Sequence, residues 1–154
     1  MSDEKFSDPI EARRKAMDYL ARREHGRTEL LAKLEKAGFD RDAGEDAVAG
    51  LIEDGLQSDQ RFVEAFIQSR FNQGKGPVRI RAELKDRRLA GGMIEQALAD
   101  AGQDWYALAR QVRQRKFGAG RPADFNDKAK QMRFLQYRGF EPDHIQAAVS
   151  ADND

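Results

Sequence analysis

Lysine and arginine gather in two stretches of this chain of 154 residues. Residues 70–88 include seven basic and two acidic side chains, and residues 110–121 include five basic side chains and no acidic one. Residues 37–69 have the opposite balance, with eight acidic and two basic side chains. Clustered lysine and arginine steer the approach of anionic partners, and arginine can bind a carboxylate or phosphate through two parallel hydrogen bonds. The chain is therefore expected to bind an acidic protein surface or a nucleic-acid backbone, unless these charges only keep helix faces hydrated.

Seven of these cations are predicted to meet the partner, four in the first stretch and three in the second. They are Arg70, Lys75, Arg79, Arg81, Arg113, Arg115 and Lys116. Helical residues two positions apart point in different directions, so Arg79, Arg81 and Lys85 are not expected on one narrow stripe. Some of these charges are therefore expected to be only solubilising.

Aromatic residues interleave with the basic stretches and raise the possibility of stacking on nucleic-acid bases. They are Phe71, Tyr106, Phe117 and Tyr137. Phe71 and Tyr106 have the spacing of core positions, and core is the favoured interpretation for both. Phe117 follows Lys116 and precedes a glycine-rich loop, so it stays open between the two roles.

Residues for catalysis or metal binding are few. The two histidines, His25 and His144, lie far apart at polar helix ends, where capping or solvent exposure is their expected role. Cysteine is absent, which excludes thiol nucleophiles, disulfides and cysteine metal sites. The glycine-rich segment 74–77 lacks the spacing of a nucleotide-binding loop and a preceding strand, so a capped turn is favoured over an anion site. We expect no enzyme, no metal and no cofactor.

Composition favours a thin, elongated protein over a deep globule. Charged residues make up 35% of the chain and apolar residues 40%, enough to cover one face of each helix. The formal net charge is zero, so only local imbalance can attract a charged partner. The N-terminal residues lack the apolar run of a signal peptide, and no stretch approaches the roughly 18 apolar residues of a membrane span. A cytoplasmic monomer is the expectation.

A repeated step positions these residues. The segments 34–39, 84–89 and 135–140 each run from a leucine to an apolar residue, and successive copies lie 50 and 51 residues apart. A near-constant period indicates a tandem array. Apolar residues return every three or four positions and strand alternation does not persist, which predicts helices. We predict an all-α fold, an elongated array of three helix-turn-helix-like repeats with nine helices, whose units can share one continuous core.

The period also predicts the boundaries. We expect a flexible N-terminus at residues 1–8, three-helix repeats at 9–55, 56–102 and 103–150, and a disordered C-terminus at 151–154.

Capping residues agree with this division. The helix starts are predicted at Gly26 with Glu29, at Ser58 or Asp59, at Gly76 with Pro77, at Asp124 and at Pro142. Gly38 and Gly139 fit left-handed caps at helix ends. Arg88 occupies the same position in the middle copy, where it is expected either to be strained or to end its helix differently.

The stretch 58–98 closely resembles the central block of the RecX family of bacterial regulatory proteins. It reads SDQRFVEAFIQSRFNQGKGPVRIRAELKDRRLAGGMIEQAL. The shared features are an Asp before Arg-Phe, a helix ending in Ser-Arg, then Gly-Pro, two arginines and Glu-Leu, and a closing Ile-Glu-Gln-Ala-Leu. The segments REHGRTELLAKLEKAGF and FLQYRGFEPDHIQAAV resemble the first and last blocks of the family. The chain departs from the family at two helix ends. Arg88-Leu89 stands where the family usually has Lys-Gly followed by an aliphatic residue, and Gly26 stands where a capping Ser is common.

The resemblance implies a non-enzymatic regulator of recombination, DNA repair and the SOS response. Members of the family bind the RecA recombinase, especially its filament on single-stranded DNA, and restrain ATP hydrolysis, strand exchange and co-protease activity. The leading hypothesis is that successive units bind the filament by charge-assisted contacts. Two alternatives stay open: a helix-turn-helix-like module that binds DNA directly, even if weakly, and a plain helical adaptor for another protein.

Overall fold

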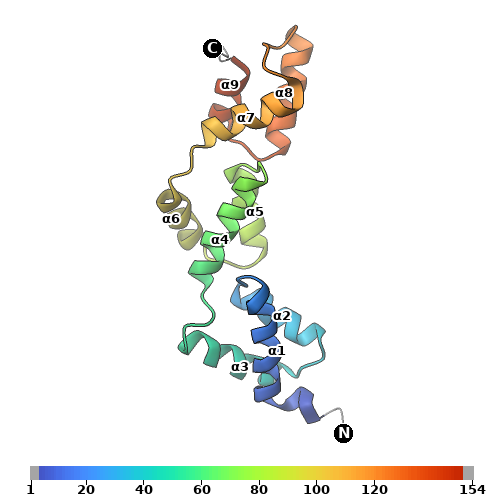
Figure 1. Ribbon diagram of the computed structural model, residues 1–154, viewed down its shortest axis with the longest axis vertical. Coiled ribbons are helices and arrows are strands. Elements are labelled where there is room, and N and C mark those ends of the chain that lie inside the picture. Colours follow the sequence, from blue (N-terminus) through green and yellow to red (C-terminus); the bar gives the residue numbers. More distant parts are fainter. Residues whose placement is uncertain (1–3, 151–154) are drawn as a thin grey trace.

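The protein is an elongated stack of helices. The computed structural model describes residues 4–150, which form nine α-helices and one 3₁₀ turn and contain no strand. The turn is η1 (Glu4–Ser7), and the helices are α1 (Pro9–Arg22), α2 (Arg27–Lys36), α3 (Arg41–Glu53), α4 (Asp59–Asn72), α5 (Pro77–Asp86), α6 (Gly91–Ala101), α7 (Trp105–Phe117), α8 (Phe125–Tyr137) and α9 (Pro142–Ser150). Figure 1 shows three successive three-helix units, α1–α3, α4–α6 and α7–α9, with the chain ends at opposite tips. The predicted all-α array of three units is confirmed.

Each unit buries a hydrophobic cluster of its own. In every unit the first and third helices pack together, and the second helix packs against the third. The clusters centre on Leu30, Leu34 and Leu51 in the first unit, Ile80, Leu84 and Ile94 in the second, and Leu135, Phe140 and Ile145 in the third. Among the described residues, only Trp105 packs against two of them, the second and the third. The units therefore do not share the single continuous core that their repetition allowed.

The repeated step is a helix cap in all three units. The backbone N–H groups of Phe39, Leu89 and Phe140 donate to the carbonyls of Leu34, Leu84 and Leu135 at 3.0, 3.2 and 3.2 Å. This six-to-one bond is characteristic of the Schellman motif, which needs a left-handed residue just before the donor. That residue is Gly38 in the first unit and Gly139 in the third, with φ of 106° and 96°.

Arg88 takes the left-handed position in the second unit. Its φ is 64°, and among the described residues it is the only non-glycine residue with positive φ. Its N–H donates to the Lys85 carbonyl at 3.0 Å, as the N–H of Gly38 does to Glu35 at 2.9 Å. The middle helix therefore ends in the same way as the others, with the strain that a side chain brings to this conformation.

Helix starts follow the predicted caps with two exceptions. Ser58 accepts from the Arg61 N–H at 3.2 Å and Asp124 from the Asp127 N–H at 2.8 Å, as expected. Pro77 and Pro142 each occupy the first position of their helix. Asp59 does not cap its own helix, because its carboxylate accepts from the Arg27 N–H at 2.7 Å.

Glu29 was expected to be the remaining half of a capping box at Gly26. Its carboxylate instead accepts two hydrogen bonds from Arg23, at 3.0 and 2.8 Å.

The N-terminal segment was expected to be flexible as far as residue 8, and this is wrong for the part that the structure describes. Residues 4–7 form η1, and the Phe6 ring packs against Phe39 with its centroid 5.4 Å away. The Phe6 carbonyl accepts from the Asp40 N–H at 2.7 Å, and Asp8 caps α1 through the Ile10 N–H. The apolar Phe6 fixes the segment on the first unit. Residues 1–3 and the predicted disordered segment 151–154 lie outside the described residues.

Replacing Arg88 by glycine should stabilise the protein. A left-handed non-glycine residue costs roughly 1–2 kcal/mol, and the greater freedom of glycine in the unfolded chain offsets part of this. We expect Arg88→Gly to raise the free energy of unfolding by about 0.5–1 kcal/mol in urea denaturation. The control Lys85→Gly, at an exposed position inside α5, should lower it by about 1 kcal/mol. A loss of stability in both variants would contradict the expectation.

Candidate partner-binding surface

The second and third units dock through their backbones. The N–H groups of Gly76 and Val78, at the start of α5, donate to the carbonyls of Arg138 and Gly139, just after α8, both at 2.9 Å. A helix start has unpaired N–H groups and a helix end has unpaired carbonyls, so each end satisfies the other. Their partial charges are also opposite. Segment 74–77 is therefore a docking turn whose N–H groups at Gly76 and Val78 are already paired.

Arg81 strengthens this junction. Its guanidinium pairs with Glu141 at 2.7 Å and with Glu95 at 2.8 Å, which links α5 to α6 and to the start of α9. Partial burial alone would lower the pKa of Arg81, but the hydrogen bonds to the two carboxylates raise it. Arg81 was predicted to contact the partner, but in the structure its charge is paired with Glu95 and Glu141 of the same chain.

A band of cations and aromatic rings crosses the same junction, and we call it the junction surface. It consists of Lys75, Arg79, Lys116, Phe134, Tyr137 and Arg138. The Arg79 guanidinium lies 5.5 Å from the centroid of Tyr137, whose side chain is 77% exposed. Arg138 and Lys116 lie 5.6 and 5.8 Å from the centroid of Phe134. Such cation–π contacts hold charged groups in place at the surface.

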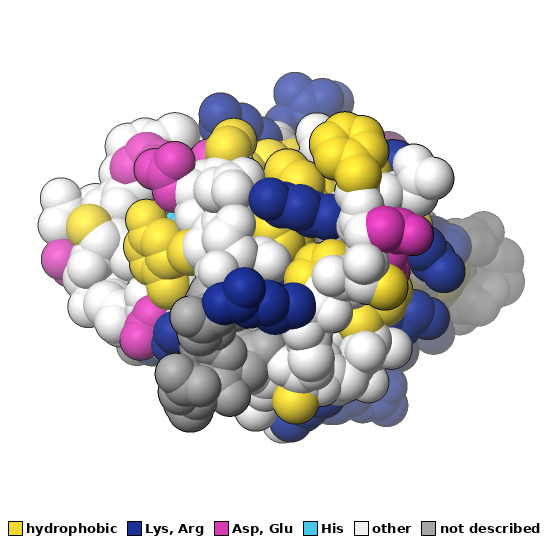
Figure 2. All heavy atoms as spheres, turned by 90° about the horizontal axis from the view of Figure 1, so that it is seen from above, with side chains coloured by type: hydrophobic (Ala, Val, Ile, Leu, Met, Phe, Trp, Pro, Cys, Tyr) yellow, Lys and Arg dark blue, Asp and Glu magenta, His cyan; other side chains and the backbone are white. Residues whose placement is uncertain are grey.

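The positive charges of this surface influence one another. Partial burial lowers the pKa of Lys75, and the nearby charges of Arg70, Arg79 and Arg138 lower it further, while Glu83 opposes them. A carboxylate or phosphate arriving here would relieve this repulsion. In Figure 2, which views the third unit end-on, Lys and Arg side chains lie beside hydrophobic ones.

Arg113 does not belong to this surface, and its prediction as a partner contact is wrong. Its side chain is 1% exposed, because it lies on the inward stripe of α7 that also includes Ala109. Its Nε donates to Gln131 at 2.8 Å and its Nη2 donates to the Gly120 carbonyl. Its Nη1 has no hydrogen-bond partner among the described residues. Arg113 therefore supports the loop between α7 and α8.

The other predicted residues lie in three places. Lys75, Arg79 and Lys116 lie on the junction surface, and Arg115 is exposed on α7. Arg70 points toward the first unit and pairs with Glu83 at 3.1 Å.

The prediction overlooked Arg138 and Arg87, which lie beside Arg79 and Arg70 in space. Arg138 stands apart from both basic stretches. Its position just before the left-handed cap at Gly139 was the available signal.

The roles predicted for the aromatic residues near the basic stretches are confirmed in one case and wrong in another. Phe71 packs in the core of the third unit, with its ring 5.4 Å from Trp105. Tyr106 was expected in the core and is 47% exposed, although its ring packs on His144. Phe117 is half-buried against Phe134, at 5.4 Å.

His144 performs the capping role expected of it. Its Nδ1 accepts from the Glu141 N–H at 3.2 Å, so this nitrogen is unprotonated. Burial lowers the pKa of His144, which opposes protonation there.

His25 joins the first two units. It lies at a polar helix end as expected, bonded to the carbonyl of Arg23 at the end of α1, but it is buried and not exposed to solvent. The ring is 1% exposed, its Nδ1 donates to the Arg23 carbonyl at 3.0 Å, and its Nε2 accepts from Lys33 at 2.8 Å. The His25 carbonyl accepts from Gln57, which also donates to Asp59. Burial lowers the pKa of His25, and the charges of Arg23 and Lys33 add to this, while the bond to the Arg23 carbonyl and the charge of Glu29 oppose it.

Residues 4–150 contain no group of three or more histidine or acidic side chains placed to hold a metal ion. No helix in the same range has the length and apolar character that crossing a membrane requires.

Comparisons with known proteins identify the family. Three family models match in order along the chain: the first three-helix domain of RecX at residues 12–51, the second at 58–98 and the third at 103–149. The chain belongs to the RecX family. Regulatory protein RecX of Halorhodospira halophila is 48% identical over 88% of this chain and 84% of its own length. The RecX of Ectopseudomonas mendocina is 48% identical over 91% of this chain and 93% of its own.

Solved RecX structures share the fold. A crystal structure of regulatory protein RecX superimposes with a TM-score of 0.76 at 18% identity, covering 93% of this chain and 72% of that one. The structure of RecX from Lactobacillus salivarius gives 0.75 at 20% identity, covering 92% and 94%. These likenesses show the fold, and the three domain models show that this chain is built from the three-helix domains of the family.

Substituting Gly76 should separate the second and third units. A Cβ at Gly76 would overlap the Gly139 carbonyl, so the two interunit hydrogen bonds could not form. We expect Gly76→Ala to lower the free energy of unfolding by about 2 kcal/mol, the scale of leaving buried backbone groups unpaired. Gly92→Ala is the control, because a Cβ there meets no atom within 4 Å and alanine favours the helix. Equal effects in urea denaturation would contradict the role given to Gly76.

Acidification should weaken the protein through its histidines. Since the folded pKa of His25 is below the ordinary value of 6.5, the unfolded chain binds a proton first as the pH falls. The free energy of unfolding should therefore be highest above pH 6.5 and fall as the pH drops through and below that value. His25→Gln keeps a donor and an acceptor without titrating, so its pH slope should be smaller, with the slope from His144 remaining. Identical slopes in denaturation from about pH 7.5 to about pH 5.5 would contradict this.

Proposed function

We propose that this RecX protein is a non-catalytic regulator that binds RecA and its filament on single-stranded DNA in the cytoplasm. It inhibits ATP hydrolysis, strand exchange and co-protease activity, and so modulates recombination, repair and the SOS response. The observation that carries the proposal is the junction surface, a cationic and aromatic band that spans two firmly docked units of a RecX-family chain.

The junction surface suits an anionic partner for a physical reason. Ordering flexible cationic side chains on binding usually reduces affinity. Here Arg79 is placed over Tyr137, and Arg138 and Lys116 over Phe134, before any partner arrives. Less entropy is then lost when a carboxylate or phosphate binds. The fixed position of α5 against α8 sets the spacing between the cations.

The elongated array provides the second argument. Three units arranged end to end can touch successive positions on a long partner (Figure 1). Once one unit is bound, the contacts of the others become effectively intramolecular, so weak contacts add up to a tight complex. A chain with no net charge can achieve specific binding in this way without a strong attraction to every polyanion.

Direct contact with the DNA of the filament is a second candidate, which the pairing of Arg79 with the exposed ring of Tyr137 favours. Stacking on single-stranded bases uses aromatic rings and cations together. On this alternative, the protein alone would bind bare single-stranded DNA with a steep dependence on salt, and RecA would not change the affinity.

The proposed function predicts the effect of a charge reversal on inhibition. Wild-type protein should lower the DNA-dependent ATPase rate of RecA, and Arg79→Glu should raise the concentration for half-inhibition about tenfold, the effect of about 1.4 kcal/mol. Arg41→Glu is the matched control, since Arg41 is exposed on α3, far along the chain from the junction surface, and should leave inhibition unchanged.

Two outcomes would count against these ideas separately. If wild type at several-fold excess over RecA does not inhibit, the function is refuted. If wild type inhibits and Arg79→Glu inhibits equally, only the junction surface is refuted. A circular-dichroism melt of each variant checks that it is folded.

A further inference from the structure

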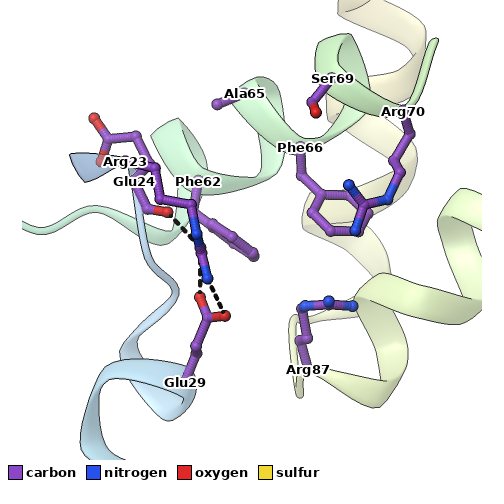
Figure 3. Close-up of a pocket in the computed structure, with 9 residues that line it drawn as sticks. All are labelled: Arg23, Glu24, Glu29, Phe62, Ala65, Phe66, Ser69, Arg70 and Arg87. Carbon is purple, nitrogen blue, oxygen red and sulfur yellow. Dashed lines mark hydrogen bonds and ion pairs between the residues drawn. The ribbon is translucent and has the colours of Figure 1, made fainter. Parts of the chain in front are cut away.

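A groove separates the first unit from the second. Two hollows of about 280 and 330 Å³ meet there, and Glu29 and Arg87 line both. The floor of the first hollow is one face of α4, where Ala65 is exposed and the rings of Phe62 and Phe66 lie just beneath the surface, 3% and 7% exposed (Figure 3). The groove thus offers an apolar floor between two charged walls.

One wall presents two guanidinium groups that lie over the same aromatic ring. Those of Arg70 and Arg87 lie 4.1 and 4.8 Å from the centroid of the Phe66 ring. Arg70 pairs with the carboxylate of Glu83 at 3.1 Å, whereas Arg87 donates through Nη1 to the Glu83 backbone carbonyl at 3.2 Å. Within residues 4–150, no carboxylate forms an ion pair with Arg87. The Glu83 carboxylate also lies 3.9 Å from Arg79, so Arg70 shares its counter-charge and Arg87 has none.

The acidic residues of the opposite wall are already paired. The Arg23 guanidinium and the Glu29 carboxylate form a two-bond fork, drawn as dashed lines in Figure 3. The hydrogen bond to Glu29 raises the pKa of Arg23, in keeping with a tight pair. Glu24 pairs with Arg61 at 3.3 Å. This wall has no charge left to neutralise the arginines across the groove.

The two hollows together carry a positive excess. Five basic residues and three acidic ones line them, although the whole chain has no net charge. A continuous phosphate backbone that followed the groove would pass Asp86, which lines the second hollow and forms no ion pair within residues 4–150. A single carboxylate at Arg70 and Arg87 would be confined to the first hollow, which Asp86 does not line. Charge and shape therefore favour an acidic peptide over a nucleic acid.

We propose that this groove binds an acidic segment of the partner protein, with an Asp or Glu carboxylate between Arg70 and Arg87 and a neighbouring apolar side chain on Ala65, over the buried ring of Phe62. The inference rests on the proposed function in taking the filament protein as the source of the segment. An arginine whose face is stacked on an aromatic ring keeps its edge for two parallel hydrogen bonds to a carboxylate. Arginine beside aromatic residues is also the usual composition of strongly binding interface centres.

A peptide titration tests the groove without RecA. The probe is a blocked peptide of alternating glutamate and leucine, added to the full-length ¹⁵N-labelled protein and followed by NMR. We expect shifts at the Nε–H signals of Arg70 and Arg87 and at the amides of Ala65 and Ser69. A glutamine–leucine peptide should bind at least about fivefold more weakly, since it lacks the charge.

Variants decide whether the groove is responsible. Arg87→Gln should weaken binding of the glutamate peptide at least about fivefold, and Arg87→Lys, which keeps the charge without the fork, should fall between it and wild type. Lys85→Gln, exposed on α5 and outside the groove, should bind as wild type does. A spectrum that otherwise matches wild type shows that each variant is folded.

The inference is overturned if the shifts centre elsewhere, if both peptides bind equally, or if Arg87→Gln binds like wild type. Shifts of the same groove signals by bare single-stranded DNA, with none from the glutamate peptide, would also overturn it in favour of a nucleic-acid groove. Filament binding is measured separately by co-sedimentation with RecA on single-stranded DNA. If the protein binds the filament but not the peptide, the proposed function stands and the proposed role of the groove is contradicted. If it binds the peptide but not the filament, the groove still binds acidic segments, and RecA is contradicted as their source.

Discussion

The meeting of two helix ends is the constraint on which the junction surface depends. The start of α5 has N–H groups without helical partners, and the end of α8 has carbonyls without them, and the two sets satisfy each other. This contact is possible only because Gly76 and Gly139 lack side chains that would separate the backbones. Once the ends are joined, Arg79 lies over Tyr137, and Arg81 can form its ion pair with Glu141. A surface that spans two units is thus fixed by local backbone chemistry.

Features that depend on a few adjacent residues could be predicted from the sequence. The leucine steps located the helix ends because the Schellman cap requires a left-handed residue and an apolar contact at fixed offsets. Ser58, Asp124 and Pro142 located helix starts for equally local reasons. Arg88 shows how strong the repeat is, because the middle unit keeps the same cap although its side chain disfavours the conformation.

Features that depend on packing between distant segments could not be predicted. Arg113 has the sequence setting of an exposed cation, but the partners that bury it, Gln131 and Gly120, belong to the next helix and to the loop before it. His25 has the appearance of a polar helix end and is enclosed because the second unit contributes Gln57 to its carbonyl. Arg138 and Arg87 become important only through neighbours that the fold supplies. A basic stretch identifies a charged region, and only the fold shows which of its members face outward.

Because the units have separate hydrophobic clusters, a destabilising change in one unit need not unfold the others. Each unit has one hydrophobic cluster. Trp105 and Phe71 link the clusters of the second and third units, and no apolar residue in the described range links the first cluster to another, so the first unit is the most independent part. Arrays of this kind gain and lose order unit by unit, with each neighbour contributing an interface term. The first unit is joined to the second largely through polar groups. Local unfolding confined to the first unit would therefore leave the contact between α5 and α8 in place.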